Sequence, residues 1–151
     1  MVHKPRILLI DDDETVRDTV SAVLEENGYI VDMAKNGKEA IVASNTKFYN
    51  LALIDIKLPD VEGVELLAAM KETTPEMVKI VVTGYPTLEN AINALNQGAD
   101  GYIVKPFKNE ELLDKIQKHL KKQQDAKYYN EEKIADFIES RSKEMESQEH
   151  V

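Results

Sequence analysis

The chain has no cysteine, which excludes disulfide bonds and thiolate metal sites and is compatible with a cytoplasmic protein. It also lacks any apolar run near the ~18 residues of a membrane-spanning helix. Residues 7–10 are too few to form the apolar segment of a signal peptide. Clustered Lys and Arg are missing too, and the net charge is −9. We therefore expect a cytoplasmic protein that makes no direct contact with membrane or nucleic acid.

What is present is a regular alternation of short apolar runs with helical patterns. Apolar runs predict strands at residues 6–10, 29–34, 51–55, 78–82 and 101–105, and a helical face follows each run. Short strands made almost only of Val, Ile and Leu are typical of a parallel sheet with helices on both faces. We predict an α/β fold, a flavodoxin-like (βα)5 doubly wound parallel five-stranded sheet with strand order 2-1-3-4-5.

The sequence changes character after about residue 122. Residues 123–151 are rich in Lys, Gln and Glu, and we expect a helical, charged C-terminal extension or linker after a domain that spans residues 4–122. Asn130 is placed to cap a new helix whose first turn carries Glu131 and Glu132. Because isolated helices are marginal in water, we expect an apolar stripe on this helix to dock, on its own domain, in a dimer seam or as a linker to another part. A homodimer would form through this helix or through the face of the helices predicted at residues 88–95 and 112–120. The stripe consists of Ile134, Phe137, Ile138 and Met145.

Charged residues stand at the ends of three predicted strands. Asp11-Asp12-Asp13 follows the first, Asp55 ends the third, and Lys105 ends the fifth. Ligands of open parallel sheets bind just outside the carboxyl ends of the strands. A carboxylate at the end of a buried strand is costly unless its charge is used. These residues therefore predict one site, whose chemistry involves a divalent metal and a phosphoryl group.

The acidic residues suit Mg²⁺, which prefers oxygen ligands from one or two carboxylates, several waters and a phosphate. Asp11 and Asp12 with Asp55 would supply that set, although the choice of two acids from the run of three depends on register. The backbone carbonyl of Lys57 is a candidate for a further ligand. The alternative is that the run only caps the helix that follows it, a role we expect for one of the three acids. Asp13 would point away from the site or toward the start of that helix.

Two more strand ends extend this site. Lys105 would offset the repulsion among the carboxylates and can contact a phosphate oxygen, although a plain surface lysine is the alternative. Pro106 allows a cis peptide bond after Lys105. Thr83 ends the fourth strand before Gly84, and its hydroxyl can donate to a phosphate oxygen. Thr83 is a candidate for the site only because its strand is expected to end at the same edge of the sheet as the acids.

In this order, the motifs resemble the receiver domain of bacterial and archaeal response regulators, the CheY-like phospho-acceptor modules of two-component signalling. The resemblance covers residues 4–122 without an obvious gap. One motif alone would be weak, but the ordered set at these separations is highly specific. The motifs are Asp11-Asp12-Asp13-Glu14, Leu53-Ile54-Asp55-Ile56-Lys57-Leu58-Pro59, Gly63, Thr83-Gly84-Tyr85, and the run from Gly98 to Phe107 with Lys105-Pro106 in it.

The resemblance implies a role for each residue of the site. Asp55 would accept a phosphoryl group from the phosphohistidine of a sensor histidine kinase and form an acyl phosphate. Asp11 and Asp12 would hold Mg²⁺ with Asp55 and the Lys57 carbonyl. The resemblance implies a signalling protein rather than an enzyme, one that catalyses only its own phosphorylation and dephosphorylation.

The resemblance also implies how the signal leaves the site. Lys105 and Thr83 would contact the new phosphate, and Tyr102 would be the switch residue whose rotamer follows the shift of Thr83. The added charge would bias a two-state surface, here at about residues 88–120. Lys57 and Tyr85 occupy positions that tune dephosphorylation in such domains. No output motif is recognisable, so we expect a downstream protein or an output domain outside this segment.

Two rival interpretations share parts of the pattern. Asp11 begins a D-x-D-x-T motif that, with Thr83 and Lys105, resembles a haloacid dehalogenase-like phosphatase in which Asp11 is the nucleophile. That interpretation leaves Asp55 without a role and lacks a further acidic strand end after Lys105. A flavodoxin-type electron carrier would need a Ser/Thr/Gly-rich phosphate loop at the position of the three aspartates, which would repel a flavin phosphate.

Overall fold

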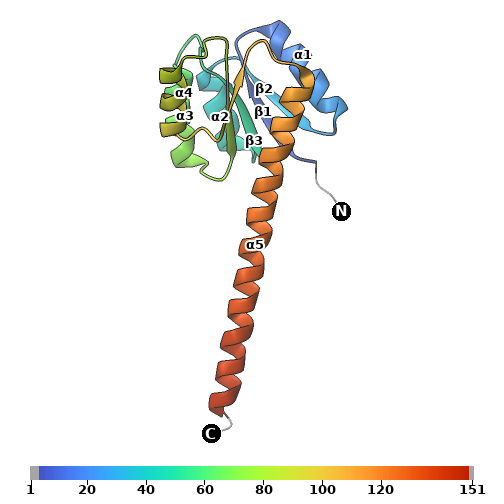
Figure 1. The fold of residues 1–151 in the computed structure, drawn as a ribbon, viewed down its shortest axis with the longest axis vertical. Coiled ribbons are helices and arrows are strands. Elements are labelled where there is room, and N and C mark those ends of the chain that lie inside the picture. The colour runs from blue at the N-terminus through green and yellow to red at the C-terminus, as the bar shows by residue number, and fades with distance from the viewer. Residues whose placement is uncertain (1–3, 150–151) are drawn as a thin grey trace. The chain divides into compact units, whose positions relative to one another are not determined.

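The computed structural model describes residues 4–149, with side chains for residues 4–145. The chain divides into two compact units, one up to Leu120 and the other from Lys121 onward. Strands and helices alternate as the sequence predicts, along the ribbon in Figure 1. The elements are β1 (Arg6–Ile10), α1 (Glu14–Glu26), β2 (Ile30–Ala34), α2 (Gly37–Thr46), β3 (Leu51–Asp55), α3 (Gly63–Thr73), β4 (Val78–Thr83), α4 (Leu88–Asn96), β5 (Gly101–Val104) and α5 (Asn109–Glu149).

The strands form one parallel sheet in the order β2-β1-β3-β4-β5, which confirms the predicted topology. Ile10 pairs with Ile54, and Asp55 pairs with Val82. The carboxyl ends of β1, β3 and β4 are therefore level with one another. Every residue of the two central strands β3 and β4 is buried, as expected for strands that helices cover on both faces.

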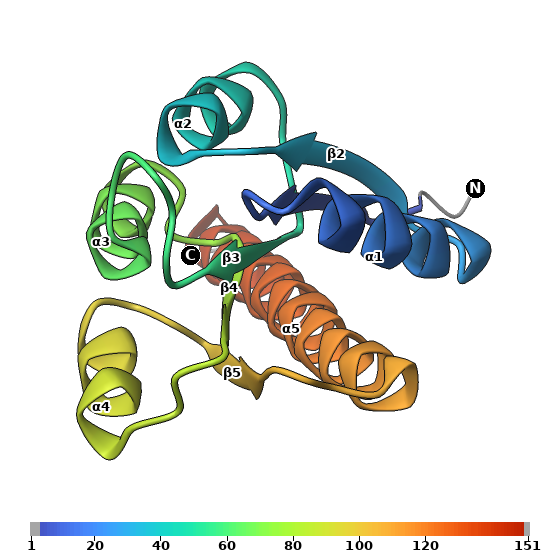
Figure 2. The same ribbon diagram turned by 90° about the horizontal axis from the view of Figure 1, so that it is seen from above.

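Helices α2, α3 and α4 lie on one face of the sheet, while α1 and the first turns of α5 lie on the other (Figure 2). Each face has its own hydrophobic core. Leu66, Leu67 and Met70 of α3 contribute to the first, and Leu24 of α1 and Ile116 of α5 contribute to the second. The sheet is thus fixed from both sides, so the positions of its strand ends are well defined.

The helix boundaries follow local sequence signals. Asp13 caps α1 as expected, because its Oδ1 accepts a hydrogen bond from the backbone N of Val16 at 3.3 Å. Thr87 caps α4 through the backbone N of Asn90. The only residue of α4 that is buried is Ala94, and three apolar residues of this helix are exposed, namely Leu88, Ile92 and Leu95.

Helix α5 is continuous from Asn109 to Glu149, so the expectation that Asn130 caps a separate helix is wrong. Residues 121–130 contain no Gly or Pro and are mostly good helix formers, so the helix propagates through them. Beyond Leu120, Ile134, Phe137 and Ile138 expose 59%, 66% and 59% of their surface. None of the helices in residues 4–149 has the length and hydropathy of a membrane span.

Candidate functional site

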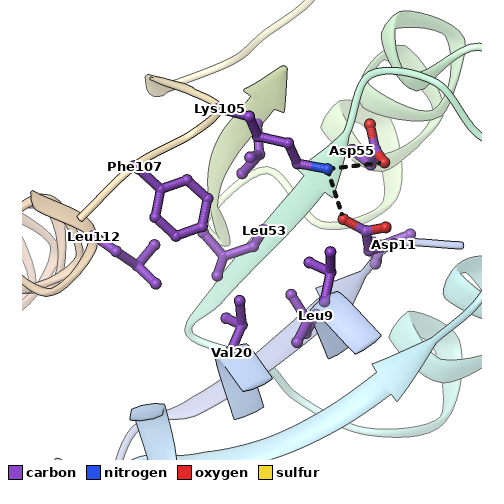
Figure 3. A pocket seen from close by; sticks show the side chains of 11 residues that line it. Leu9, Asp11, Val20, Leu53, Asp55, Lys105, Phe107 and Leu112 are labelled. Atoms are coloured by element: carbon purple, nitrogen blue, oxygen red, sulfur yellow. Dashed lines mark hydrogen bonds and ion pairs between the residues drawn. The ribbon is translucent and has the colours of Figure 1, made fainter. Parts of the chain in front are cut away.

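Three of the predicted site residues meet at the carboxyl edge of the sheet. Asp11 directly follows β1, Asp55 is the last residue of β3, and Lys105 directly follows β5. The Lys105 Nζ lies 3.0 Å from Asp11 Oδ2 and 3.4 Å from Asp55 Oδ2, so one ammonium bridges two carboxylates (Figure 3). The Asp11 and Asp55 side chains are only 4% and 11% exposed. Two nearly buried acids therefore share one cation.

A third carboxylate completes an oxygen cluster at this edge. Asp11, Asp12 and Asp55 each offer one oxygen, and the three oxygens lie within 4.8 Å of one another. Asp13 is engaged elsewhere, because its carboxylate caps α1 while its backbone N donates to Asp11 Oδ1 at 2.9 Å. The cluster thus contains the first two acids of the run, and its all-oxygen donor set fits a hard divalent cation such as Mg²⁺.

The β3–α3 loop holds Asp55 through its own backbone. The backbone N of Lys57 donates to Asp55 Oδ1 at 3.1 Å. An antiparallel bridge pairs Lys57 with Glu62, and the backbone N of Gly63 donates to Ile56 O at 2.8 Å. A Cβ at Gly63 would lie 2.6 Å from Asp55 O and 2.6 Å from the Ile56 Cα. Only glycine allows this close backbone approach directly behind Asp55.

Burial and neighbouring charges shift the pKa values of both Asp55 and Lys105. Burial raises the pKa of Asp55, and the charge of Asp11 adds to this, although the Lys57 amide and the Lys105 ammonium act in the opposite direction. Burial by itself would lower the pKa of Lys105, but the hydrogen bonds and charges of Asp11 and Asp55 outweigh it, so this pKa is raised. A positive charge on Lys105 is therefore secure at neutral pH, whereas the Asp55 carboxylate would gain from a second cation.

Apolar side chains form the floor beneath the charged groups. Figure 3 shows Leu9, Val20, Leu53, Phe107 and Leu112 below Lys105 and the two acids, and they line a cavity of about 10 Å³. A space of this size holds at most one water molecule. The carboxylates are thus solvated from one side only, which explains why burial dominates the pKa of Asp55.

Thr83 and Lys105 are joined through the backbone. Thr83 ends β4 with no exposed surface, and its carbonyl accepts from the backbone N of Lys105 at 2.7 Å. Its Oγ1 accepts from the backbone N of Tyr85 at 2.9 Å. The peptide bond between Lys105 and Pro106 is cis, as the sequence suggests. Thr83 therefore lies at the same rim as the acids, in the strand next to β3.

Tyr85 links this rim to two other elements. The Lys57 Nζ lies 3.9 Å from the centroid of the Tyr85 ring, in cation–π contact. The Asn90 Nδ2 donates to Tyr85 O at 3.1 Å, which connects the loop after Thr83 to the first turn of α4. The β3–α3 loop and α4 thus both contact the segment that follows Thr83.

Tyr102, the predicted switch residue, lies in the middle of β5. Its side chain is half-buried and packs against the core that α2, α3 and α4 cover. Its Oη is buried and makes no hydrogen bond to any described residue. Its backbone O accepts from the Nζ of Lys115. An inward aromatic ring with an unpaired hydroxyl is therefore present at this position.

Two residues that fix the loops around the site were missed by the sequence reasoning. The Arg17 Nη1 donates to the backbone O of Asp11 at 2.8 Å and so fixes the acidic loop to α1. Asp60, in the loop after Asp55, accepts from the backbone N atoms of Gly37 and Lys38. The Pro59-Asp60 pair marks a turn, but no spacing rule identifies a partner so far along the chain.

Comparisons with known proteins agree with this geometry. The response regulator receiver domain family matches residues 7–117. The transcriptional regulatory protein DltR of Streptococcus agalactiae is 35% identical over 111 residues, which cover 74% of this chain and 50% of DltR. CusR of Escherichia coli is 32% identical over 117 residues, which cover 78% of this chain and 52% of CusR. The chain thus spans about half the length of these curated relatives.

A solved structure shows the same likeness in three dimensions. The CheY-like response regulator receiver domain protein of Methanospirillum hungatei has a TM-score of 0.80 and 45% sequence identity, over 82% of this chain and 99% of that one. These similarities do not favour the phosphatase interpretation. With the predicted sheet order in place and acids and lysine converging at its carboxyl edge, this chain belongs to the response regulator receiver domain family.

Proposed function

We propose that this chain is a phospho-acceptor module that receives a phosphoryl group from a sensor histidine kinase on Asp55. A carboxylate oxygen of Asp55 forms a bond to phosphorus while the bond between phosphorus and the kinase imidazole nitrogen breaks, which gives an acyl phosphate. The observation that carries this proposal is the Asp55 carboxylate itself. It is 11% exposed, lies 3.4 Å from the Lys105 Nζ, and belongs to the same oxygen cluster as Asp11 and Asp12.

The oxygen cluster defines the cofactor in this proposal. The carboxylates of Asp11, Asp12 and Asp55 with the carbonyl of Lys57 would hold Mg²⁺. Bound there, the metal would neutralise negative charge on the phosphoryl oxygens. Lys105 contributes a further positive charge, 3.4 Å from Asp55 Oδ2. Phosphoryl transfer relies mainly on positioning and charge neutralisation, so no general base is needed.

Thr83 and Tyr102 would convert the added charge into a change of surface. A hydroxyl can donate and accept together, so Thr83 can donate to a phosphate while its Oγ1 still accepts from Tyr85. The unpaired Tyr102 Oη costs about 1–3 kcal/mol in its buried position, so an outward rotamer that hydrates it is close in free energy. Phosphorylation would shift this balance and alter the surface of α4, β5 and α5, at about residues 88–120.

The partner of that surface would be a downstream protein or an output domain. DltR and CusR are described as transcriptional regulatory proteins, and this chain covers about half of each. Control of such an output through the α4–β5–α5 surface is part of the proposal. A homodimer through the stripe Ile134, Phe137, Ile138 and Met145 stays a prediction, as does the cytoplasmic location.

A small-molecule phosphodonor tests the proposal. Acetyl phosphate with Mg²⁺ should add one phosphoryl group to the wild-type protein, as measured by intact-protein mass spectrometry, and chelation of the metal should abolish this. Asp55→Asn should remain unmodified and Asp11→Asn should react slowly. Asp18→Asn, an exposed carboxylate of α1 outside the cluster, should behave like wild type. Phosphorylation of Asp55→Asn but not of Asp11→Asn would instead support the phosphatase interpretation.

A further inference from the structure

The loop between Asp55 and α3 is tied at its base and at its tip. At the base, Lys57 pairs with Glu62, and the backbone N of Gly63 donates to Ile56 O. The tip consists of residues 58–61, of which Leu58 and Val61 pack against the core. Among the described residues, the side chain of Asp60 makes the hydrogen bonds that connect this tip to another element.

Asp60 holds the start of α2 with both of its oxygens. Its Oδ1 accepts from the backbone N of Gly37 at 2.9 Å, and its Oδ2 accepts from the backbone N of Lys38 at 3.0 Å. These amides belong to the first turn of α2, where backbone N–H groups have no partner within the helix. The two hydrogen bonds lower the pKa of the exposed Asp60 carboxyl, so it is ionised at neutral pH.

The helix start and the loop tip are also in direct apolar contact. A Cβ at Gly37 would overlap with Val61 Cγ1, so a larger side chain there would push the two segments apart. Helix α2 has a cap of its own as well, because the Asn36 Oδ1 accepts from the backbone N of Glu39 at 2.8 Å. Asp60 is thus an additional bond across two segments, made by a residue of the loop.

We propose that Asp60 is a positioning residue of the phosphorylation site. By fixing the loop tip to α2, it keeps in place the loop that carries Lys57, whose amide donates to Asp55 Oδ1 and whose carbonyl would be the further ligand of the metal. This inference rests on the proposed function, because the Lys57 carbonyl matters only if a cation binds there. Asp60 itself touches neither the carboxylate cluster nor the phosphoryl group.

The coupling must act in both directions, because a ligand that favours one arrangement of the loop is favoured by it in turn. Mg²⁺ binding should therefore slow hydrogen exchange at the backbone amides of Gly37 and Lys38. Without the Asp60 carboxylate, this protection should disappear. If Asp60 only stabilised the helix, Mg²⁺ would slow exchange at these two amides no more than at the rest of α2.

Two matched variants separate positioning from helix capping. Asp60→Ala removes the bond between loop and α2, whereas Asn36→Ala removes the other cap of the same helix and leaves the loop intact. Titration of each protein with MgCl2 by calorimetry should show a Kd about 3- to 10-fold higher for Asp60→Ala, since loss of supporting contacts around a metal site weakens binding. Asn36→Ala should stay within about twofold of wild type, and Asp60→Asn, which keeps one acceptor oxygen, should lie between. Circular dichroism confirms that each variant is folded.

The outcomes are distinct. An unchanged Mg²⁺ affinity in Asp60→Ala, while wild type binds Mg²⁺ and is phosphorylated, overturns the positioning role and leaves the proposed function intact. An equal loss in Asn36→Ala also overturns it, because the effect would then come from helix stability. A wild-type protein that neither binds Mg²⁺ nor accepts a phosphoryl group overturns the proposed function and this inference with it.

Discussion

Replacing Lys105 by methionine tests whether the charges of the site balance as the distances indicate. In the metal-free protein, Lys105→Met leaves Asp11 and Asp55 close together without a cation, with side chains 4% and 11% exposed. Methionine keeps most of the side-chain volume, so the change is mainly electrostatic. We expect the variant to be clearly less stable than wild type at neutral pH.

The magnitude follows from the two ion pairs. At an effective dielectric constant of about 20, charges 3.0 Å and 3.4 Å apart attract by about 5.5 and about 4.9 kcal/mol. Most of this gain is offset by the cost of dehydrating the three groups. Removing one partner of a buried pair costs about 3–5 kcal/mol, and the 28% exposure of Lys105 places the expected loss near the lower end, at about 3 kcal/mol.

Urea denaturation with and without MgCl2, and at several pH values, tests whether the lost stability is electrostatic in origin. Under the proposed function, Mg²⁺ should bind the variant's uncompensated carboxylates more strongly than those of wild type, so saturating MgCl2 should recover much of the lost stability. The loss should also shrink as the pH falls through the raised pKa of Asp55, because protonation removes the charge that Lys105 neutralises. On the alkaline side, the contribution of Lys105 is full below the ordinary lysine pKa and is lost as the pH rises through its own raised pKa.

The control is Lys118→Met, which changes an exposed lysine of α5 and should alter stability by no more than about 0.5 kcal/mol. A loss in Lys105→Met that is independent of both Mg²⁺ and pH would refute the electrostatic account. It would mean that Lys105 matters through packing of its aliphatic chain instead.

Two further predictions concern the supports of the fold. Tyr49→Phe should cost about 1–2 kcal/mol at pH 7, because Tyr49 Oη donates to Asp32 Oδ2 at 2.7 Å. That hydrogen bond lowers the pKa of Asp32. The stabilisation from the bond is therefore present above the ordinary carboxyl pKa and is lost as the pH falls through the lowered pKa of Asp32. Unfolding curves of variant and wild type that still differ at pH 2 would contradict this. Gly63→Ala should cost about 3 kcal/mol or more in a thermal melt, since the new Cβ would meet backbone atoms at 2.6 Å. Gly84→Ala, with nothing within 4 Å of its Cβ, should be nearly neutral, and equal losses in the two variants would exclude the steric explanation.

The fold was predictable because its signals are local and repeated. Five apolar runs at regular spacing leave few arrangements once crossovers must be right-handed, and the observed sheet order is the predicted one. The carboxylate cluster was predictable for the same reason: strand ends in a parallel sheet share one rim, so Asp11, Asp55 and Lys105 had to converge. The cap formed by Asp13 required only its position before a helical pattern.

Other features depend on tertiary contacts that no local rule encodes. The Asp60 carboxylate meets α2, which precedes it in the chain by a whole strand. Lys79 interrupts an apolar strand yet is only 2% exposed, because its Nζ reaches the carbonyls of Thr74 and Met77 at 2.7 and 2.8 Å. The cap expected at Asn130 failed because an N-cap residue starts a helix only where the preceding turn has ended.

Helix α4 is anchored by few buried groups, and this sets how easily the helix can open. Ala94 is its one buried residue, and a buried methyl contributes only about 0.8 kcal/mol to holding a helix in place. Helix α3, by comparison, buries Leu66, Leu67 and Met70. In a native-state exchange experiment, α4 would therefore open at a free energy well below that of the global transition. Asn90 connects its first turn to the loop after Thr83 twice, through its Nδ2 to Tyr85 O and through its backbone N to Thr87 Oγ1, so the start of α4 should follow a displacement of that loop while the sheet beneath it stays intact.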